Sequence, residues 1–318
     1  MLDSPRSTVR HRALAAAGTA AALAMVLAAC GSAGSANDAS MPGMDHGSMP
    51  SAYSSSPAVP SSSASATSSM SAMPGMDEMA TGNGLADAQD GYRLTSPDTA
   101  LPAGKRIGYR FTITGPDGKP VTAFAVDQTK RLHFYAIRSD LTGFQHLHPT
   151  MAADGTWTAD LAALAPGSYR MFASFTPGSG SGKGTAFVLS RTVTVPGTVT
   201  NTPLPTASGT AETDGYTVTV KGDLMAGMEH SLTATITQGG EPVTDLEPYL
   251  DTYAHLTAFH QGDSAFAHLH PTTPVNGDHG GPTLSFHAEL PTSGDWRLFL
   301  QFQAGGKLHT AALTLPVR

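Results

Sequence analysis

The chain has 318 residues, which is enough for about two domains. Glycine (34) and proline (23) are abundant, while aromatic residues make up only 7%, so short strands joined by turns are favoured over a helical bundle or coiled coil. The formal net charge of −7 argues against a nucleic-acid partner. A single cysteine excludes an intramolecular disulfide and a cysteine-based zinc or iron–sulfur site, whereas 13 His and 13 Met offer many metal ligands.

Residues 1–29 have the pattern of an export signal. Arg6, Arg10 and Arg12 precede a short apolar run that ends in the letters LAAC, with Cys30 as the only cysteine. This ending resembles the bacterial lipoprotein signal, which implies cleavage before Cys30 and its lipidation, for example by palmitate. The alternative is an ordinary secretory signal. A lipidated Cys30 would hold the protein on the extracytoplasmic face of the cell membrane.

Residues 30–88 form a predicted disordered tether, because they are rich in Ser, Ala, Gly, Pro and Met and poor in large aliphatic side chains. The string MPGMD occurs twice, and thioether sulfur is a soft ligand that suits Cu(I). The pattern resembles the Met/His-rich copper-gathering segments of bacterial copper-resistance proteins. Low-complexity filler is the alternative. The candidate ligands are Met41, Met44, His46, Met49, Met70, Met73, Met76 and Met79.

The remainder of the chain contains an internal repeat. Residues 132–149 align without a gap to residues 254–271, and seven of the 18 aligned positions are identical. We therefore expect a first module over residues 89–197, a linker over 198–212 and a second module over 213–318.

Each module carries short alternating apolar runs bounded by turn residues, such as Arg110–Thr114 and Leu232–Thr237. About seven such strands in 100 residues predict an all-β fold. Each module is expected to be an antiparallel β-sandwich, immunoglobulin-like or cupredoxin-like.

Three histidines are identical in the aligned window. A two-residue turn at Gly262-Asp263 would pair Thr257 with His268 and place His255 opposite His270. Paired residues, and residues two apart on a strand, share a face of the sheet. The sequence therefore predicts one histidine trio in each module: His133, His146 and His148 in the first, and His255, His268 and His270 in the second.

Three neutral imidazoles suit Cu(II), zinc or nickel and leave an open coordination position. Copper is favoured by its intrinsic affinity and by the methionine-rich tether, with zinc as the alternative cofactor. A packing layer that both copies inherited from a common ancestor would explain the same histidines without any metal. Met225, Met228 and His230 are candidates for an accessory soft site.

The segments LHFY (132–135) and GFQHLHP (143–149) resemble a family of actinobacterial secreted proteins. Their modules are similar to YtkA-like and CopC-like β-sandwiches, and the latter are periplasmic copper carriers. The resemblance implies metal handling. The N-terminal amine through which CopC-like proteins bind copper is not carried over, because lipidation would block it here.

Together these patterns predict a cell-surface lipoprotein that binds copper for sequestration or transfer, with a copper transporter or chaperone as partner. The alternative function is a non-metal binding or adhesion module built of tandem sandwiches. An enzyme is not expected, because the sequence has no blue-copper cysteine, nucleophile motif or phosphate-binding loop.

Overall fold

A computed structural model of the chain describes residues 82–318, which lie within one compact unit. The described part is all-β, and none of it forms a helix that could cross a membrane. The predictions for the signal peptide, for Cys30 and for the tether ligands lie outside the described residues. Those ligands are Met41, Met44, His46, Met49, Met70, Met73, Met76 and Met79.

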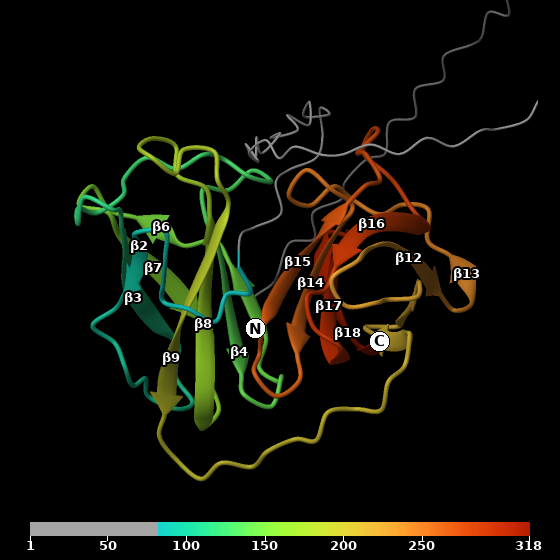
Figure 1. Cartoon of the computed structure of the whole chain (residues 1–318). Helices are drawn as coiled ribbons and strands as arrows, with labels where there is room; N and C mark the ends of the chain where they lie inside the picture. Colours follow the sequence, from blue (N-terminus) through green and yellow to red (C-terminus); the bar gives the residue numbers. More distant parts are fainter. Residues whose placement is uncertain (1–81) are drawn as a thin grey trace, which may run out of the picture. The chain divides into compact units, whose positions relative to one another are not determined.

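The first module is a sandwich of two antiparallel sheets, with strand orders β1-β2-β3-β7-β6 and β5-β4-β8-β9 (Figure 1). Its strands are β1 (Ala88–Gln89), β2 (Tyr92–Thr95), β3 (Ile107–Thr114), β4 (His133–Arg138), β5 (Gln145–Leu147), β6 (Thr150–Met151), β7 (Thr156–Leu161), β8 (Gly167–Phe175) and β9 (Phe187–Val195).

The second module repeats this architecture with the continuous strand order β10-β11-β12-β16-β15-β14-β17-β18, while β13 pairs with β12. Its strands are β10 (Thr210–Thr213), β11 (Tyr216–Lys221), β12 (Glu229–Gln238), β13 (Glu241–Pro242), β14 (Ala254–His260), β15 (Phe266–Pro271), β16 (Thr283–Glu289), β17 (Gly294–Ala304) and β18 (Lys307–Val317).

One strand distinguishes the two modules. In the second module β15 pairs with β14 at its start and with β16 at its end, so it joins both sheets. In the first module the corresponding segment is divided into β5 and β6 around Pro149. The second module has a proline at the same place, Pro271, which ends β15, so the proline alone does not explain why only the first-module strand is divided. The predicted tandem β-sandwich fold is confirmed.

The first hairpin of each module uses the same two-residue turn. Asp90 and Gly91 connect β1 to β2, and Asp214 and Gly215 connect β10 to β11. All four residues have positive φ, between 48° and 85°. An Asp-Gly turn of this kind matches the twist of its flanking strands, so the repeated DG pair fixes the start of each sandwich.

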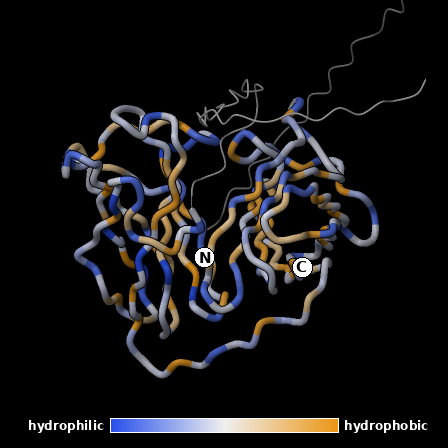
Figure 2. The backbone as a smooth tube through the Cα atoms, in the orientation of Figure 1, coloured by the Kyte–Doolittle hydropathy of each residue, from blue (hydrophilic) through white to orange (hydrophobic). Residues whose placement is uncertain are grey.

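Each sandwich encloses its own hydrophobic core, and hydrophobic residues run along the strands of both modules (Figure 2). A third cluster joins the modules, because its members come from both. Strand β4 is buried along its whole length, and β14 is buried except at its last residue, so both faces of these strands are covered. The buried members of this junction cluster are Tyr135, Ile137, Leu141, Phe172, Val188, Phe259, Phe266 and Phe299.

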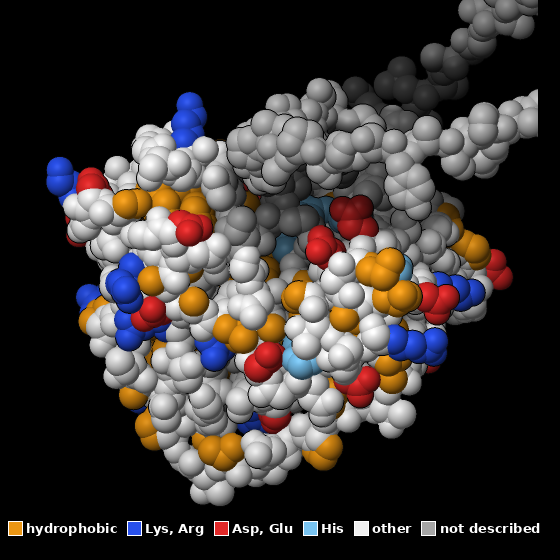
Figure 3. Space-filling model, in the orientation of Figure 1, with side chains coloured by type: hydrophobic (Ala, Val, Ile, Leu, Met, Phe, Trp, Pro, Cys, Tyr) orange, Lys and Arg blue, Asp and Glu red, His pale blue; other side chains and the backbone are white. Residues whose placement is uncertain are grey.

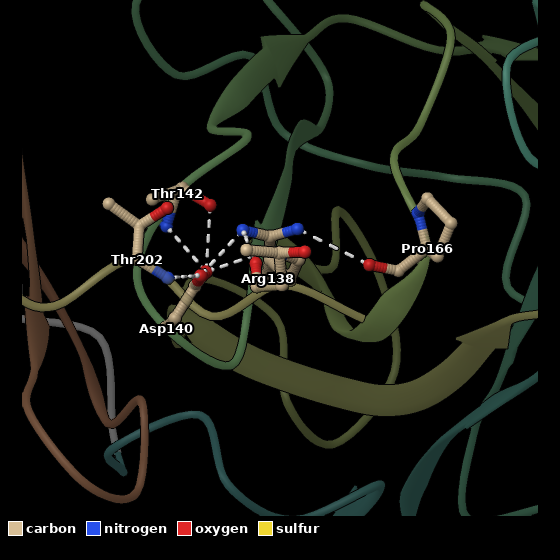
Figure 4. A network of polar contacts seen from close by, with 6 residues as sticks. Arg138, Asp140, Thr142, Pro166 and Thr202 are labelled. Carbon is tan, nitrogen blue, oxygen red and sulfur yellow. Dashed lines mark hydrogen bonds and ion pairs between the residues drawn. The ribbon is translucent and has the colours of Figure 1, made fainter. Parts of the chain in front are cut away.

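A polar network holds the linker to the first module (Figure 4). The Arg138 guanidinium donates to both carboxylate oxygens of Asp140, at 2.8 and 2.5 Å, and to the carbonyl of Pro166. Asp140 also accepts from the Thr142 hydroxyl at 2.7 Å and from the backbone N–H of Thr202 at 2.9 Å. These hydrogen bonds keep the pKa of Asp140 well below its usual range, although burial alone would raise it.

Candidate metal centre at the module junction

Both predicted histidine hairpins form with the predicted register, but the predicted pairing of His255 with His270 is wrong, because β15 leaves β14 after Leu269 and His270 pairs with His287 of β16. In the second module Thr257 lies opposite His268, and in the first Tyr135 lies opposite His146. This register puts His255, Thr257 and His268 on one face of their sheet, since side chains alternate along a strand.

The turn of the second hairpin differs from the prediction. It contains four residues, 261–264, and the N–H of Ser264 donates to the carbonyl of His260. The Asp263 carboxylate accepts from the N–H of Ala265 at 2.9 Å and contacts Nδ1 of His260 at 2.9 Å. The longer loop adds one residue on each side of the predicted turn, so the strand register is unchanged.

The two histidine trios lie together, although the sequence placed one trio separately in each module. The face of β14 that carries His255 also carries Phe259, which belongs to the junction cluster. The His255 ring lies 5.2 Å from the His146 ring and 5.6 Å from the His133 ring, measured between centroids. The cluster consists of His133, His146, His148, His255, His268 and His270.

The nitrogens of the first trio are close enough together to share a cation. Nitrogen atoms of His133, His146 and His148 all lie within 4.8 Å of one another. His133 Nε2 donates to the backbone carbonyl of Asp127 at 3.1 Å, and His146 Nδ1 donates to Oε1 of Gln301 at 2.7 Å. Carbonyl and amide oxygens only accept, so these two bonds use the single N–H of each neutral imidazole.

With Oε1 of Gln301 as the acceptor, the remaining nitrogens of this pair present lone pairs to each other; with that amide turned over, Nε2 of His146 would donate to Nδ1 of His133 instead. Nδ1 of His133 and Nε2 of His146 are 3.0 Å apart. Two facing lone pairs repel unless a proton or a cation lies between them. A cation bound by both nitrogens would relieve this repulsion.

Electrostatics disfavour a proton at this position. Burial, more than any other factor, lowers the pKa of His133, and burial together with the charges of neighbouring histidines lowers that of His146. Burial and then the charge of His133 lower the pKa of His148 to about 3. The pKa values of His255 and His268 are also well below normal, with burial again the main cause. Neutral imidazole is the form that binds metal ions.

The second trio is arranged differently. The rings of His255 and His268 are stacked, with an interplanar angle of 9° and a centroid distance of 5.2 Å, and His270 lies 5.0 Å beyond His268. Among residues 82–318 only the first trio has all its ligand atoms within 4.8 Å of one another. The second trio thus lies in the cluster without forming a facial site of its own.

A cavity of about 490 Å³ reaches the cluster at His268. Phe266, Val188 and the segment at Asn83 line it, and Glu289 adds a carboxylate. In the space-filling view, histidine atoms are visible in a hollow beside acidic side chains (Figure 3). A second cavity of about 400 Å³ is lined by His146 and Gln301, so a cation could approach the cluster from either side.

Sequence reasoning missed Gln301 and the carbonyl of Asp127, which orient the first trio from outside it. Gln301 is only 6% exposed and lies in the apolar strand β17. A polar side chain inside an apolar run is the signal that could have identified it, because buried amides need partners. A backbone carbonyl such as that of Asp127 leaves no signal in a sequence.

The other candidate ligands lie outside the cluster. His230 Nε2 accepts from the N–H of Met225 at 3.1 Å, while the side chains of Met225 and Met228 are exposed. His309 is buried but contacts Asp214 at 2.8 Å and a backbone carbonyl at 3.2 Å. These histidines already have hydrogen-bond partners.

Fold and site together define a protein of two tandem β-sandwich modules with a buried histidine cluster at their junction. The chain belongs to the family described as Domain of unknown function (DUF8832), which matches it twice, over residues 86–195 and 211–318. No curated protein sequence matches the chain.

Solved structures give distant likenesses. The Escherichia coli adhesin FdeC is 14% identical with a TM-score of 0.24, over 73% of this chain and 65% of that one, so the match spans just under two thirds of the adhesin. The fibronectin(III)-like modules of Clostridium thermocellum CbhA are 12% identical with a TM-score of 0.19, over 71% and 92%. A protein from Corynebacterium diphtheriae described as membrane anchored is 12% identical with a TM-score of 0.21, over 72% and 59%. Likenesses this weak carry no argument about function.

Proposed function

We propose that this protein binds a transition-metal ion at His133, His146 and His148, and that the ion is copper. The observation that carries the proposal is the convergence of three imidazoles, with Nδ1 of His133 and Nε2 of His146 3.0 Å apart and their rings held by Asp127 and Gln301. A neutral, buried nitrogen donor set of this kind suits Cu(II) best, with zinc as the alternative.

The histidine cluster favours metal binding over structural packing. Among the described residues, Nε2 of His148, Nε2 of His268 and both nitrogens of His255 are buried without a hydrogen-bond partner. Buried polar groups normally find partners, and their absence is unfavourable. A packing layer would gain from apolar residues at these positions, whereas a metal ion turns free lone pairs into ligands.

The proposed cellular role combines the histidine site with two features of the N-terminal sequence, the lipidation site and the methionine clusters. A lipid on Cys30 would anchor the chain to the extracytoplasmic face of the membrane, and the methionine clusters would capture Cu(I). The folded modules would separately bind copper that is already Cu(II), for sequestration or for transfer to a copper transporter or chaperone. The role requires no catalysis, so we propose a carrier and not an enzyme.

A non-metal surface-binding or adhesion module is the second candidate. The adhesin among the structural likenesses is named for that role, yet a TM-score of 0.24 does not extend it to this chain. The exposed large hydrophobic residues of the described part are Val126, Val199, Met225, Met228, Val275 and Leu308, of which only Met225 and Met228 are near each other in the sequence. Adhesion also offers no reason for buried imidazoles without partners.

Metal content is the direct test. The full chain is stripped with a chelator, loaded with Cu(II) or Zn(II), and the bound metal is measured by mass spectrometry. We expect bound copper in the wild-type chain, a loss of one equivalent in a His146→Gln/His148→Gln variant and no loss in His309→Gln. A wild-type chain that retains no metal, or a double variant with unchanged stoichiometry, would contradict the proposal.

A further inference from the structure

We infer that His255, from the second module, is a fourth ligand of the cation held by the first-module trio, so that the metal bridges the two modules. This inference rests on the proposed function and goes one step further. It replaces two separate sites by a single site to which both modules contribute.

The burial of His255 and its lack of hydrogen-bond partners are what a metal-free ligand would show. Its side chain is 1% exposed, and neither ring nitrogen has a hydrogen-bond partner among residues 82–318. A buried imidazole with both nitrogens unpartnered is unfavourable, since it has lost water and gained nothing in return. Coordination is the interaction that would compensate for this loss.

The position of His255 points to the first trio. Its ring centroid lies 5.2 Å from that of His146 and 5.6 Å from that of His133. These spacings resemble those within the trio, where His133 lies 5.3 Å from His146 and 5.1 Å from His148. By ring spacing, His255 lies beside the first-module trio, although the group whose ligand atoms all lie within 4.8 Å of one another does not include it, so its ring must shift to become a ligand.

The neighbours of His255 orient its ring without occupying its nitrogens. His268 stacks on one side with an interplanar angle of 9°, and Tyr249 meets the ring at 73° with centroids 6.2 Å apart. Such ring contacts fix a plane but form no bond to the in-plane lone pair. The nitrogens of His255 stay available for a cation that enters through the cavity at His268.

The bridge would lie beside an apolar interface. Phe144 of the first module stacks on Phe299 of the second, with centroids 4.1 Å apart and planes within 7°. Tyr135 and Phe266 add a second contact across the junction, at 5.0 Å. These rings hold the modules together without metal, so His255 already lies beside the trio when the ion arrives. Metal binding then strengthens a contact that already exists.

The test compares His255→Leu, His255→Gln, His146→Gln and His309→Gln in the full chain. Cu(II) affinity is measured by competition with a chelator, and the number of coordinated imidazoles by pulsed electron paramagnetic resonance. We expect four imidazoles in the wild-type chain and three in both His255 variants, with an affinity loss larger than the roughly tenfold effect of removing an outer-shell partner. His309→Gln, which changes a buried histidine with partners, should keep four.

His255→Leu also separates a ligand from a structural residue. Leucine removes two unpartnered nitrogens from a buried position, so thermal unfolding of the metal-free variant should occur at or above the wild-type temperature while copper affinity falls. A lower unfolding temperature with unchanged affinity would overturn the inference.

Two further outcomes keep the hypotheses distinct. Three imidazoles in the wild-type chain and in the His255 variants, with equal affinity, would overturn the fourth-ligand inference and leave the proposed function standing. A second equivalent of copper that disappears with His255 while the first is unaffected would likewise reject the bridge. No copper binding by any chain would reject the proposed function itself.

Discussion

Replacing Gln301 tests whether an amide of the second module orients the metal site of the first. In Gln301→Met, His146 loses the acceptor that holds the proton on Nδ1 at 2.7 Å. The proton can then move to Nε2 and form a hydrogen bond to Nδ1 of His133 across the 3.0 Å gap. A metal ion would have to break that bond before it could enter.

The size of this effect follows from the bonds involved. A net intramolecular hydrogen bond contributes about 0.5–1.5 kcal/mol, and loss of an outer-shell partner typically weakens metal binding roughly tenfold to a hundredfold. We therefore expect copper affinity to fall about tenfold or more in Gln301→Met, measured by chelator competition. Gln301→Glu keeps an acceptor and adds a negative charge, so it should bind copper at least as tightly as the wild-type chain.

Gln303 provides a matched control on the same strand. Its amide donates to Glu247 at 2.7 Å and takes no part in the histidine cluster. Gln303→Met removes a hydrogen bond of the same length and should leave copper affinity unchanged. Equal affinity losses in Gln301→Met and Gln303→Met, or none in Gln301→Met, would refute the positioning role.

Three further predictions concern stability and anchoring. Asp140→Asn breaks the ion pair with Arg138, whose side chains are 8% and 10% exposed, and should lower the free energy of unfolding by about 3 kcal/mol at pH 7. Because the pKa of Asp140 is lowered in the folded state, the ion pair stabilises the fold above pH ~4 and this contribution is lost as the pH falls below that value. Urea titrations of the variant and the wild-type chain should therefore give the same free energy of unfolding in acid. Phe299→Ala removes the ring stacked on Phe144 and should destabilise by about 3–5 kcal/mol, and calorimetry should show two transitions, one per module, where the wild-type chain shows one. Cys30→Ala should release the chain from the membrane fraction, and an intact anchor in that variant would exclude lipidation at this residue.

The histidine hairpins could be predicted because local rules determine them. A short turn fixes the strand register, and alternation then fixes which side chains share a face, so the pairing of Thr257 with His268 followed from the sequence alone. The loop proved two residues longer than predicted, yet symmetric growth of a hairpin loop preserves the register. The predicted strand register is therefore correct even though the predicted length of the turn is wrong.

The meeting of the two trios could not be predicted in the same way. It depends on which sheet face of one module packs on the other, and that contact lies far outside any local window. The nearly continuous apolar runs HFYAI in β4 and HLTAF in β14 indicate strands that are buried on both faces. Such runs indicate that the second face of each strand is covered, but they do not identify the other module as what covers it.

The strand partner of the equivalent histidines differs between the two modules. In the first module His133 pairs with Ser174 on β8, and in the second the equivalent His255 pairs with Gln301 on β17. Gln301 is long enough to reach across the junction and orient His146. Ser174 has a much shorter side chain, and in the second module Nε2 of His268, the equivalent of His146, is buried without a partner. A duplicated pair of hairpins thus supplies the six histidines. Two differences accompany the asymmetry of the trios: Gln301 replaces Ser174 as the strand partner, and His270 pairs with His287 on β16.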